Sequence, residues 1–202
     1  MLLTSRDFSS RVVDTLGDRA GEKNITVACF YFDLAAQKEQ SPTDMLGALL
    51  RQAVNGLTEI PREVVEMYYN HKKVAGGRGP QLSEILKMLQ IVSTLQRMFI
   101  CVDALDECVA EHRQVILESL REILKKSPET RLFLTGRSYI RGEVQLLLAE
   151  TVTFMDIKPN KGDVITFILA KLEKDTSKGA MNTSLKGDIL TKVPEMFSEM
   201  YV

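Results

Sequence analysis

The sequence contains few cysteines, no long apolar run and almost no net charge. Three cysteines among 202 residues are an odd number and too few for a disulfide framework. Two of them, Cys29 and Cys101, lie inside apolar runs, where a reduced thiol behaves as a small hydrophobe. No apolar run approaches the roughly 18 residues that a membrane span requires. Residues 1–7 also lack the basic and apolar regions of a signal peptide. We therefore expect a cytoplasmic protein without a membrane span.

The charge balance gives no indication of a nucleic-acid partner. The formal net charge is −1, with 45% apolar and 26% charged residues, which is typical of a soluble globular protein. His71 and His112 lie far apart in the sequence, and neither is near a cysteine in a metal-ligand spacing. The length is sufficient for one hydrophobic core and the start of a second domain.

Strand-like and helix-like apolar patterns alternate along the chain. Residues 25–32 are continuously apolar and rich in β-branched and aromatic side chains, which is typical of a strand buried on both faces. Further strands are expected at 98–102, 131–135 and 151–155, and helical periodicity around residues 8–16, 46–57, 61–71, 82–95, 115–124 and from 160 onward. This alternation predicts an α/β fold with a parallel sheet and right-handed crossovers.

The segment 99–107 ends an apolar strand with a cluster of acids, reading Phe-Ile-Cys-Val-Asp-Ala-Leu-Asp-Glu. In an open α/β sheet the carboxyl ends of strands face the ligand crevice. Asp103 at this position can hold Mg²⁺ directly or through water, and Asp106 or Glu107 can orient or deprotonate an attacking water. A purely structural alternative remains open, in which Asp103 ends the strand and Asp106 caps the next helix.

A second strand, residues 131–135, also ends on polar residues, which are Thr135, Gly136 and Arg137. If this strand and 98–102 are parallel neighbours, Arg137 projects into the same crevice as Asp103. A guanidinium at that point is suited to a terminal phosphate because its planar fork donates two parallel hydrogen bonds. The alternative is an arginine that is simply solvated.

The string Val-Asp-Ala-Leu-Asp-Glu-Cys at 102–108 resembles the Walker B segment of NACHT domains, especially the fungal NOD-like receptor type of signal-transduction ATPase. Residues 30–33, with Gln37 and Ser41, look like the second strand of that family, and 132–137 are similar to its sensor-1 strand. Residues 193–197 are similar to a Gly-Met-Phe helix segment, although Glu195 stands where the glycine belongs. The similarity covers roughly residues 1–175 in order.

The phosphate-binding loop of such ATPases, G-x-x-x-x-G-K-[ST], has no counterpart in the chain, because no Gly-Lys pair occurs in it. Gly76, Gly77 and Gly79 form a glycine-rich stretch without the lysine, and we interpret it as a surface loop. In the family, the loop is followed at once by a helix that resembles residues 2–14. We therefore expect the chain to begin just after the position of the lysine.

The resemblance implies a P-loop NTPase-like α/β core that lacks its first strand, at residues 1–158, followed at 159–202 by the start of a helical lid. It implies Mg²⁺ with ATP or GTP as the ligand in an intact parent. Asp103 would hold the metal, Asp106 and Glu107 would be catalytic, and Thr135 and Arg137 would bind the nucleotide. The other domains of a multidomain receptor in signal transduction or innate immunity would be the protein partners.

Three hypotheses for function remain open at this point. The first is an ATP- or GTP-dependent switch, and the second is a catalytically silent interaction module derived from such an NTPase. The first is supported by the acids and Arg137, the second by the missing loop. The third is an unrelated α/β enzyme that uses Asp103, Asp106 and Glu107 as metal ligands for hydrolysis. Because backbone amides and the lysine of the loop supply most phosphate binding, we expect no measurable hydrolysis by this chain alone.

Overall fold

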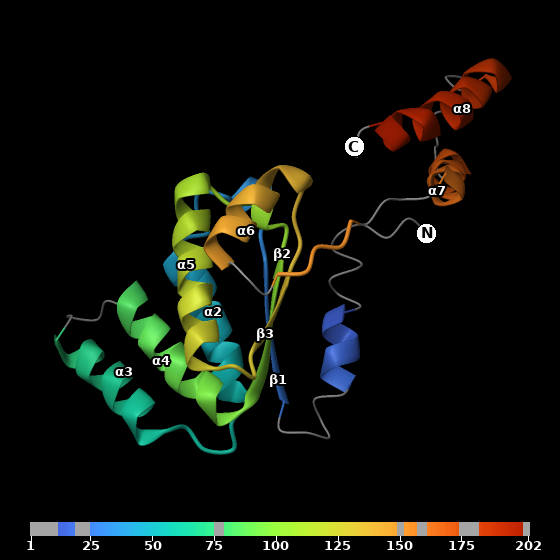
Figure 1. The fold of residues 1–202 in the computed structure, drawn as a ribbon. Helices are drawn as coiled ribbons and strands as arrows, with labels where there is room; N and C mark the ends of the chain where they lie inside the picture. The colour runs from blue at the N-terminus through green and yellow to red at the C-terminus, as the bar shows by residue number, and fades with distance from the viewer. Residues whose placement is uncertain are drawn as a thin grey trace. The chain divides into compact units, whose positions relative to one another are not determined.

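A computed structural model describes residues 12–18, 25–74, 79–148, 152–156, 161–173 and 182–199. The chain divides into two compact units, one comprising Ser5–Val152 and the other including Thr153–Val202. The first unit contains an α/β sheet with its helices, and the second contains two helices (Figure 1). No helix among the described residues is long and apolar enough to cross a membrane.

Three parallel strands form the sheet, in the order β1 (Ile25–Tyr31), β2 (Arg97–Asp103) and β3 (Arg131–Leu134). In the register, Cys29 lies opposite Cys101, Tyr31 opposite Asp103, and Val102 opposite Leu134. Helices α2 (Pro42–Asn55), α3 (Arg62–Val74) and α4 (Leu82–Leu95) lie between β1 and β2 in sequence, and α5 (Ala110–Lys126) lies between β2 and β3. The expected α/β fold with a parallel sheet is confirmed.

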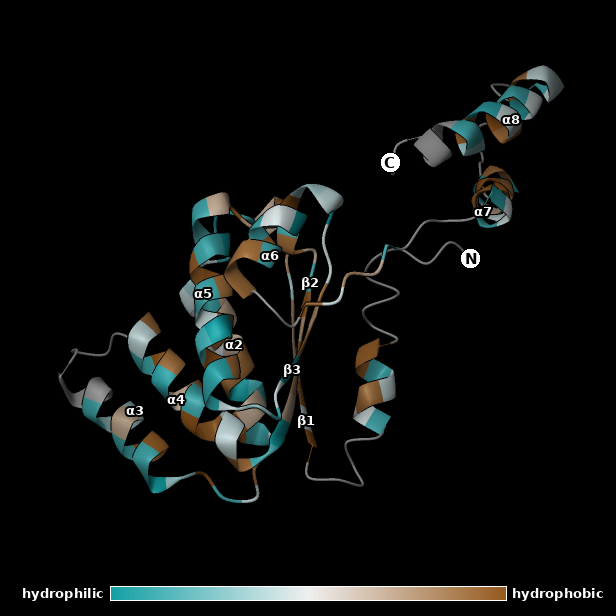
Figure 2. Ribbon diagram, viewed as in Figure 1, coloured by the Kyte–Doolittle hydropathy of each residue, from teal (hydrophilic) through white to brown (hydrophobic). Residues whose placement is uncertain are grey.

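The core forms where the helices pack on one face of the sheet (Figure 1). Met98, Ile100 and Val102, at alternate positions of β2, are fully buried beneath them. Figure 2 shows the strands as largely hydrophobic, while α2, α4 and α5 carry both hydrophobic and hydrophilic residues. The helices contribute Met45, Leu46, Leu49, Leu89, Leu117 and Leu120 to the same core.

Strand β1 has buried residues on one side only. Thr26 and Ala28 are buried, whereas Val27 and Cys29 are half-buried. The expected burial on both faces is therefore wrong for this strand, because α2 packs against one side of it.

Helix α2 begins at a capping box. Ser41 accepts a hydrogen bond from the Asp44 backbone N–H at 3.2 Å, and the Asp44 carboxylate accepts one from the Ser41 N–H at 3.1 Å. Pro42 occupies the first helical turn, where its missing N–H costs nothing. The helix ends before Gly56, at which a Cβ atom would lie only 2.2 Å from Thr26 Oγ1. Glycine is required there because the end of α2 lies directly against β1.

Two glutamine side chains bind the outer edge of β1. The Gln52 amide accepts from Cys29 N at 3.0 Å and donates to Cys29 O at 2.8 Å. The Gln40 amide accepts from Asp33 N at 3.0 Å and donates to Tyr31 O at 3.2 Å. These amides form hydrogen bonds with backbone groups that would otherwise be available to pair with another strand.

The expected strand at 151–155 does not form, since residues 152–156 have no regular secondary structure and residue 151 lies outside the described residues. A strand needs a neighbour with which to share backbone hydrogen bonds. The expectation came from the residue pattern of the segment, which supplies no such neighbour. Instead, β3 is followed by α6 (Arg141–Leu148), a helix that the sequence analysis missed.

Three short 3₁₀ turns, η1 (Leu34–Ala36), η2 (Leu105–Glu107) and η3 (Ser138–Ile140), follow the three strands. In the second unit, α7 (Lys161–Glu173) and α8 (Thr183–Glu199) confirm the helices expected after residue 160. A further helical segment covers residues 12–18, within the helix expected at 8–16 and just beyond it.

Candidate functional site

The candidate site lies at the carboxyl ends of β2 and β3. Since the strands are parallel, their ends meet at one edge of the sheet, which is where ligands bind in open α/β folds. All five residues expected to be functional lie on these strand ends or on the turns that follow them.

Asp103 and Thr135 are joined by a direct hydrogen bond between the two strands. The Thr135 hydroxyl donates to Asp103 Oδ1 and accepts from the Ala104 backbone N–H at 3.0 Å. Asp103 is only 2% exposed. Backbone bonds from Thr135 N to Val102 O, at 3.0 Å, and from Leu105 N to Thr135 O, at 2.9 Å, fix the two strand ends on either side of this pair. Thr135 therefore positions the Asp103 carboxylate.

Ala104 turns the chain immediately after Asp103. Its backbone is left-handed, with φ 53° and ψ 45°. For a residue with a Cβ atom this conformation costs about 1–2 kcal/mol. A strained backbone conformation persists only where surrounding interactions fix it. At Ala104 the hydrogen bond from its N–H to the Thr135 hydroxyl is one such interaction.

Asp106 and Arg137 form an ion pair across the same edge. Arg137 Nε lies 3.4 Å from Asp106 Oδ2, and the side chains are 78% and 9% exposed respectively. Because the guanidinium is largely in water, the pair contributes little stability and is easily separated. Gly136 lies close beside it, since a Cβ there would be 3.4 Å from Asp106 Oδ1 and 2.6 Å from Ile140 Cδ1.

Glu107 is directed to the end of β1 and away from this pair. Its carboxylate accepts a hydrogen bond from Leu34 N at 2.9 Å, and its carbonyl accepts one from the Gln37 side chain at 2.7 Å. Hydrogen bonds and the ion pair thus connect Asp103 to Thr135 and Asp106 to Arg137, whereas Glu107 holds the turn η1.

Tyr139 is a member of the site that sequence reasoning missed. Its hydroxyl donates to the Asp106 carbonyl at 3.0 Å, while its side chain is 66% exposed. A tyrosine two positions after Arg137 was the signal available in the sequence.

Tyr31 lies beside Asp103 in the register and remains a neutral phenol at physiological pH. Burial, with smaller contributions from the nearby Cys29 and Asp103, raises its pKa to about 12. Tyr31 therefore provides a proton-bearing neighbour to the acidic strand end.

The donor set of this edge suits a hard cation. Asp103 and Asp106 offer carboxylate oxygens, which Mg²⁺ prefers, together with retained waters. No group of three or more His, Cys, Asp and Glu side chains that could hold a metal occurs among the described residues. A Mg²⁺ ion at this edge would therefore take most of its ligands from phosphate and water.

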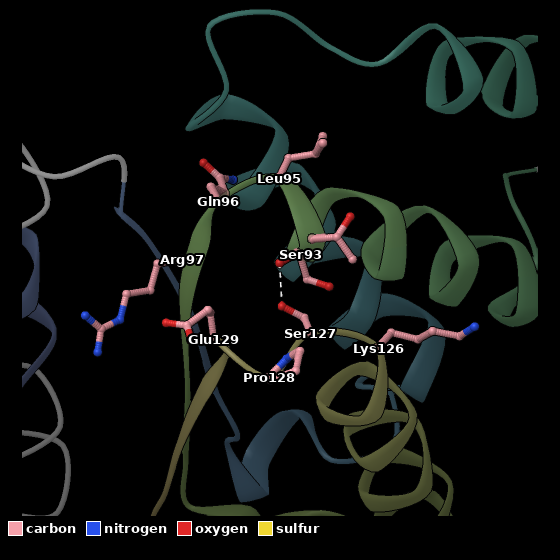
Figure 3. Close-up of a pocket in the computed structure, with 9 residues that line it drawn as sticks. Ser93, Leu95, Gln96, Arg97, Lys126, Ser127, Pro128 and Glu129 are labelled. Carbon is pink, nitrogen blue, oxygen red and sulfur yellow. Dashed lines mark hydrogen bonds between the residues drawn. The ribbon is translucent and has the colours of Figure 1, made fainter.

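A cavity of about 470 Å³ lies at the opposite edge of the sheet (Figure 3). It is lined by residues 93–97, before and at the start of β2, and by residues 126–129, which precede β3. Ser127 donates a hydrogen bond to the Ser93 carbonyl at this edge. This cavity is separate from the strand ends that carry the acids.

Two comparisons with known proteins gave matches. Residues 8–137 match the family model described as Nephrocystin 3, N-terminal. The Aeropyrum pernix ORC1 protein, solved in complex with DNA, is similar with a TM-score of 0.50 and 15% sequence identity, over 95% of this chain and 45% of that one. The chain thus spans less than half the length of that protein, and the likeness shows an α/β fold similar to that of the matched part of the ORC1 protein. A comparison with curated proteins gave no match.

Proposed function

Because the chain belongs to the nephrocystin 3, N-terminal family, we propose that it carries the metal-binding and sensor side of a NACHT-like nucleotide-binding signalling module. The observation that carries this proposal is the hydrogen bond between Asp103 and Thr135 at the ends of neighbouring parallel strands. Asp106 and Arg137 add a carboxylate and a guanidinium at the same edge.

Each residue has a distinct role in the proposed site. Asp103 would hold Mg²⁺, and Thr135 orients its carboxylate through the bond described above. Arg137, exposed and weakly paired, would exchange Asp106 for a terminal phosphate of ATP or GTP. Asp106, released by that exchange, would orient a water, and Glu107 supports the edge through η1. The chemistry that bound Mg²⁺ supplies in such sites is neutralisation of phosphate charge.

The phosphate-binding side of the module is missing from this sequence, in which no Gly-Lys pair occurs. The residues present therefore supply ligands for the metal but few of the usual contacts to the phosphates. We expect weak nucleotide affinity and no hydrolysis by this chain alone, since loop amides and lysine supply most phosphate contacts.

A catalytically silent interaction module is the second candidate, and a specific observation favours it. The acidic groups are already engaged within the chain, Asp106 with Arg137 and Glu107 with Leu34 N. Leu34 and Tyr139, on turns after β1 and β3, are each 66% exposed. Apolar side chains exposed at this edge suit contacts with other protein domains of a cytoplasmic, multidomain receptor.

The domain organisation belongs to the same proposal. Residues 1–158 would form the nucleotide-binding core, and 159–202, which include α7 and α8, would begin a helical lid. The role of these two helices as a lid rests on the resemblance to NACHT domains.

Titration calorimetry with Mg²⁺ and ATP, and separately with GTP, tests the proposal. We expect weak, magnesium-dependent binding that Asp103→Asn abolishes and Asp188→Asn, an exposed control on α8, leaves unchanged. The lack of any nucleotide binding would favour the silent module, and binding that does not depend on magnesium or on Asp103 would contradict the metal role given to Asp103. Saturable hydrolysis that Asp103→Ala abolishes would contradict the expected lack of turnover.

A further inference from the structure

Cys29 and Cys101 face each other across the first two strands of the sheet. They are register partners in the parallel pairing of β1 with β2, so their side chains lie on the same face. Neighbouring strands are about 4.8 Å apart, and disulfides typically join Cα atoms about 4.4–6.8 Å apart. The backbone therefore holds the two Cα atoms at a separation that disulfides span.

The two thiols differ in access to solvent. Cys29 is half-buried, whereas Cys101 is 3% exposed. The Cys29 thiol donates a hydrogen bond to Gln52 Oε1 at 3.6 Å, and the same amide binds both the N–H and the carbonyl of Cys29 at the outer edge of β1. Cys29 is thus the thiol that a small oxidant reaches first, on a backbone that is fixed in position.

We propose that Cys29 and Cys101 are an oxidative modification site, at which a peroxide converts the two thiols into a reversible intramolecular disulfide. The Cys29 thiolate attacks one peroxide oxygen, which breaks the O–O bond and gives a sulfenic acid and one water. The Cys101 thiolate then attacks the Cys29 sulfur, forms the S–S bond and displaces hydroxide, which leaves as a second water. Overall, two thiols lose two protons and two electrons, and hydrogen peroxide is reduced to two waters.

Two features make this bond slow to form and easy to reduce. Burial raises the pKa of the Cys29 thiol, so little of its thiolate exists at neutral pH, and a hydrogen bond with the Tyr31 hydroxyl opposes this effect. Side chains of parallel register partners stand about 4.8 Å apart, whereas Cβ atoms in a disulfide average about 3.8 Å. The linkage must pull the strands together, and strained disulfides are the readily reduced ones.

The position of the bond connects it to the strand-end site. Cys101 precedes Asp103 by two residues on β2, and Cys29 precedes Tyr31 by two residues on β1. Tyr31 and Asp103 are themselves register partners. Oxidation would therefore change the backbone two residues before Asp103, whose carboxylate Thr135 positions.

Peptide mapping of the whole chain after treatment with hydrogen peroxide tests the proposal. Trypsin leaves Cys101 and Cys108 in one peptide, 98–113, but Glu107 lies between them, so added glutamyl endopeptidase separates them. The expected product is a Cys29–Cys101 linked peptide that has lost two hydrogens and is released by dithiothreitol.

Cys108 provides the matched control, because it is also 3% exposed and its pKa is also raised to about 11 by burial. Cys108→Ser should form the linked peptide to the same extent as the unmodified chain, and Cys101→Ser should not form it. A link to Cys108, a link between two chains, or Cys29 oxidised to sulfinic acid without any link would overturn the proposal.

Discussion

The hydroxyl of Thr135, at the end of β3, donates a hydrogen bond to the carboxylate of Asp103, at the end of β2. The same hydroxyl accepts from the Ala104 N–H, so one side chain serves both the acid and the strained residue after it. Two strands that are adjacent in the sheet but separated in sequence by α5 are thereby fixed at the edge on which the proposed function depends.

Thr135→Val should destabilise the fold by about 1–3 kcal/mol, because it removes a donor to Asp103 and the acceptor of the buried Ala104 N–H. The free energy of unfolding in urea measures this loss. Thr94→Val, at an exposed hydroxyl that bonds only the Ile91 carbonyl, is the control and should change stability by less than about 0.5 kcal/mol. Equal effects at the two positions would contradict the role given to Thr135.

Ala104→Gly should stabilise the fold by about 1 kcal/mol, because glycine adopts the left-handed conformation of this position without steric cost. The same change at Ala48, within α2, should destabilise by about 1 kcal/mol, since helical glycine is unfavourable. Urea unfolding of both variants compares the signs, and a loss of stability at both positions would show that Ala104 is not strained.

Gly56→Ala should destabilise by about 1–3 kcal/mol, because the added Cβ would lie 2.2 Å from Thr26 Oγ1 and 3.2 Å from Thr26 Cβ. Thr26→Ala removes the closest atom and should relieve most of this cost. The two changes should therefore be strongly non-additive in a double-mutant cycle measured by urea unfolding. Additive losses would mean that α2 and β1 are not in contact at this point.

Stability should fall as pH rises from about 9 to about 11. Burial raises the pKa of Cys101 and Cys108 from 9.0 to about 11, so the unfolded chain loses these protons first. Their contribution is fully present below pH 9.0 and is lost as pH rises through the folded values. Urea unfolding across this range, under reducing conditions, measures the slope. The double variant Cys101→Ala, Cys108→Ala should have a shallower slope, and an unchanged slope would assign the effect to other groups.

The sheet could be predicted from the sequence because its strands are short apolar runs that end on polar residues. β2 and β3 were expected within a residue or two of their observed ends, and their parallel pairing brings their strand ends to one edge of the sheet. Periodicity also predicted α2, α4 and α5, whose buried faces are regular. The strand expected at 151–155 did not form because apolar alternation alone supplies no partner strand.

Side-chain direction in the turns could not be predicted. Glu107 follows Asp106 directly, yet its carboxylate binds Leu34 N, because a 3₁₀ turn sends consecutive side chains in different directions. The left-handed Ala104 was also not predictable, since glycine or asparagine is the usual signal for that conformation. The edge contacts of Gln40 and Gln52 depend on where α2 and the turn before it pack, which no local pattern encodes.

The glutamine amides that bind β1 determine at which edge of the sheet another strand can pair. Within the part of the chain that the structure describes, the backbone groups of Cys29, Tyr31 and Asp33 that point away from β2 already form hydrogen bonds with Gln52 and Gln40. Thr135 bonds inward to β2, so by strand alternation the backbone groups of Leu132 and Leu134 face outward on β3. An additional strand would thus extend the sheet beyond β3, and if parallel it would end next to Arg137.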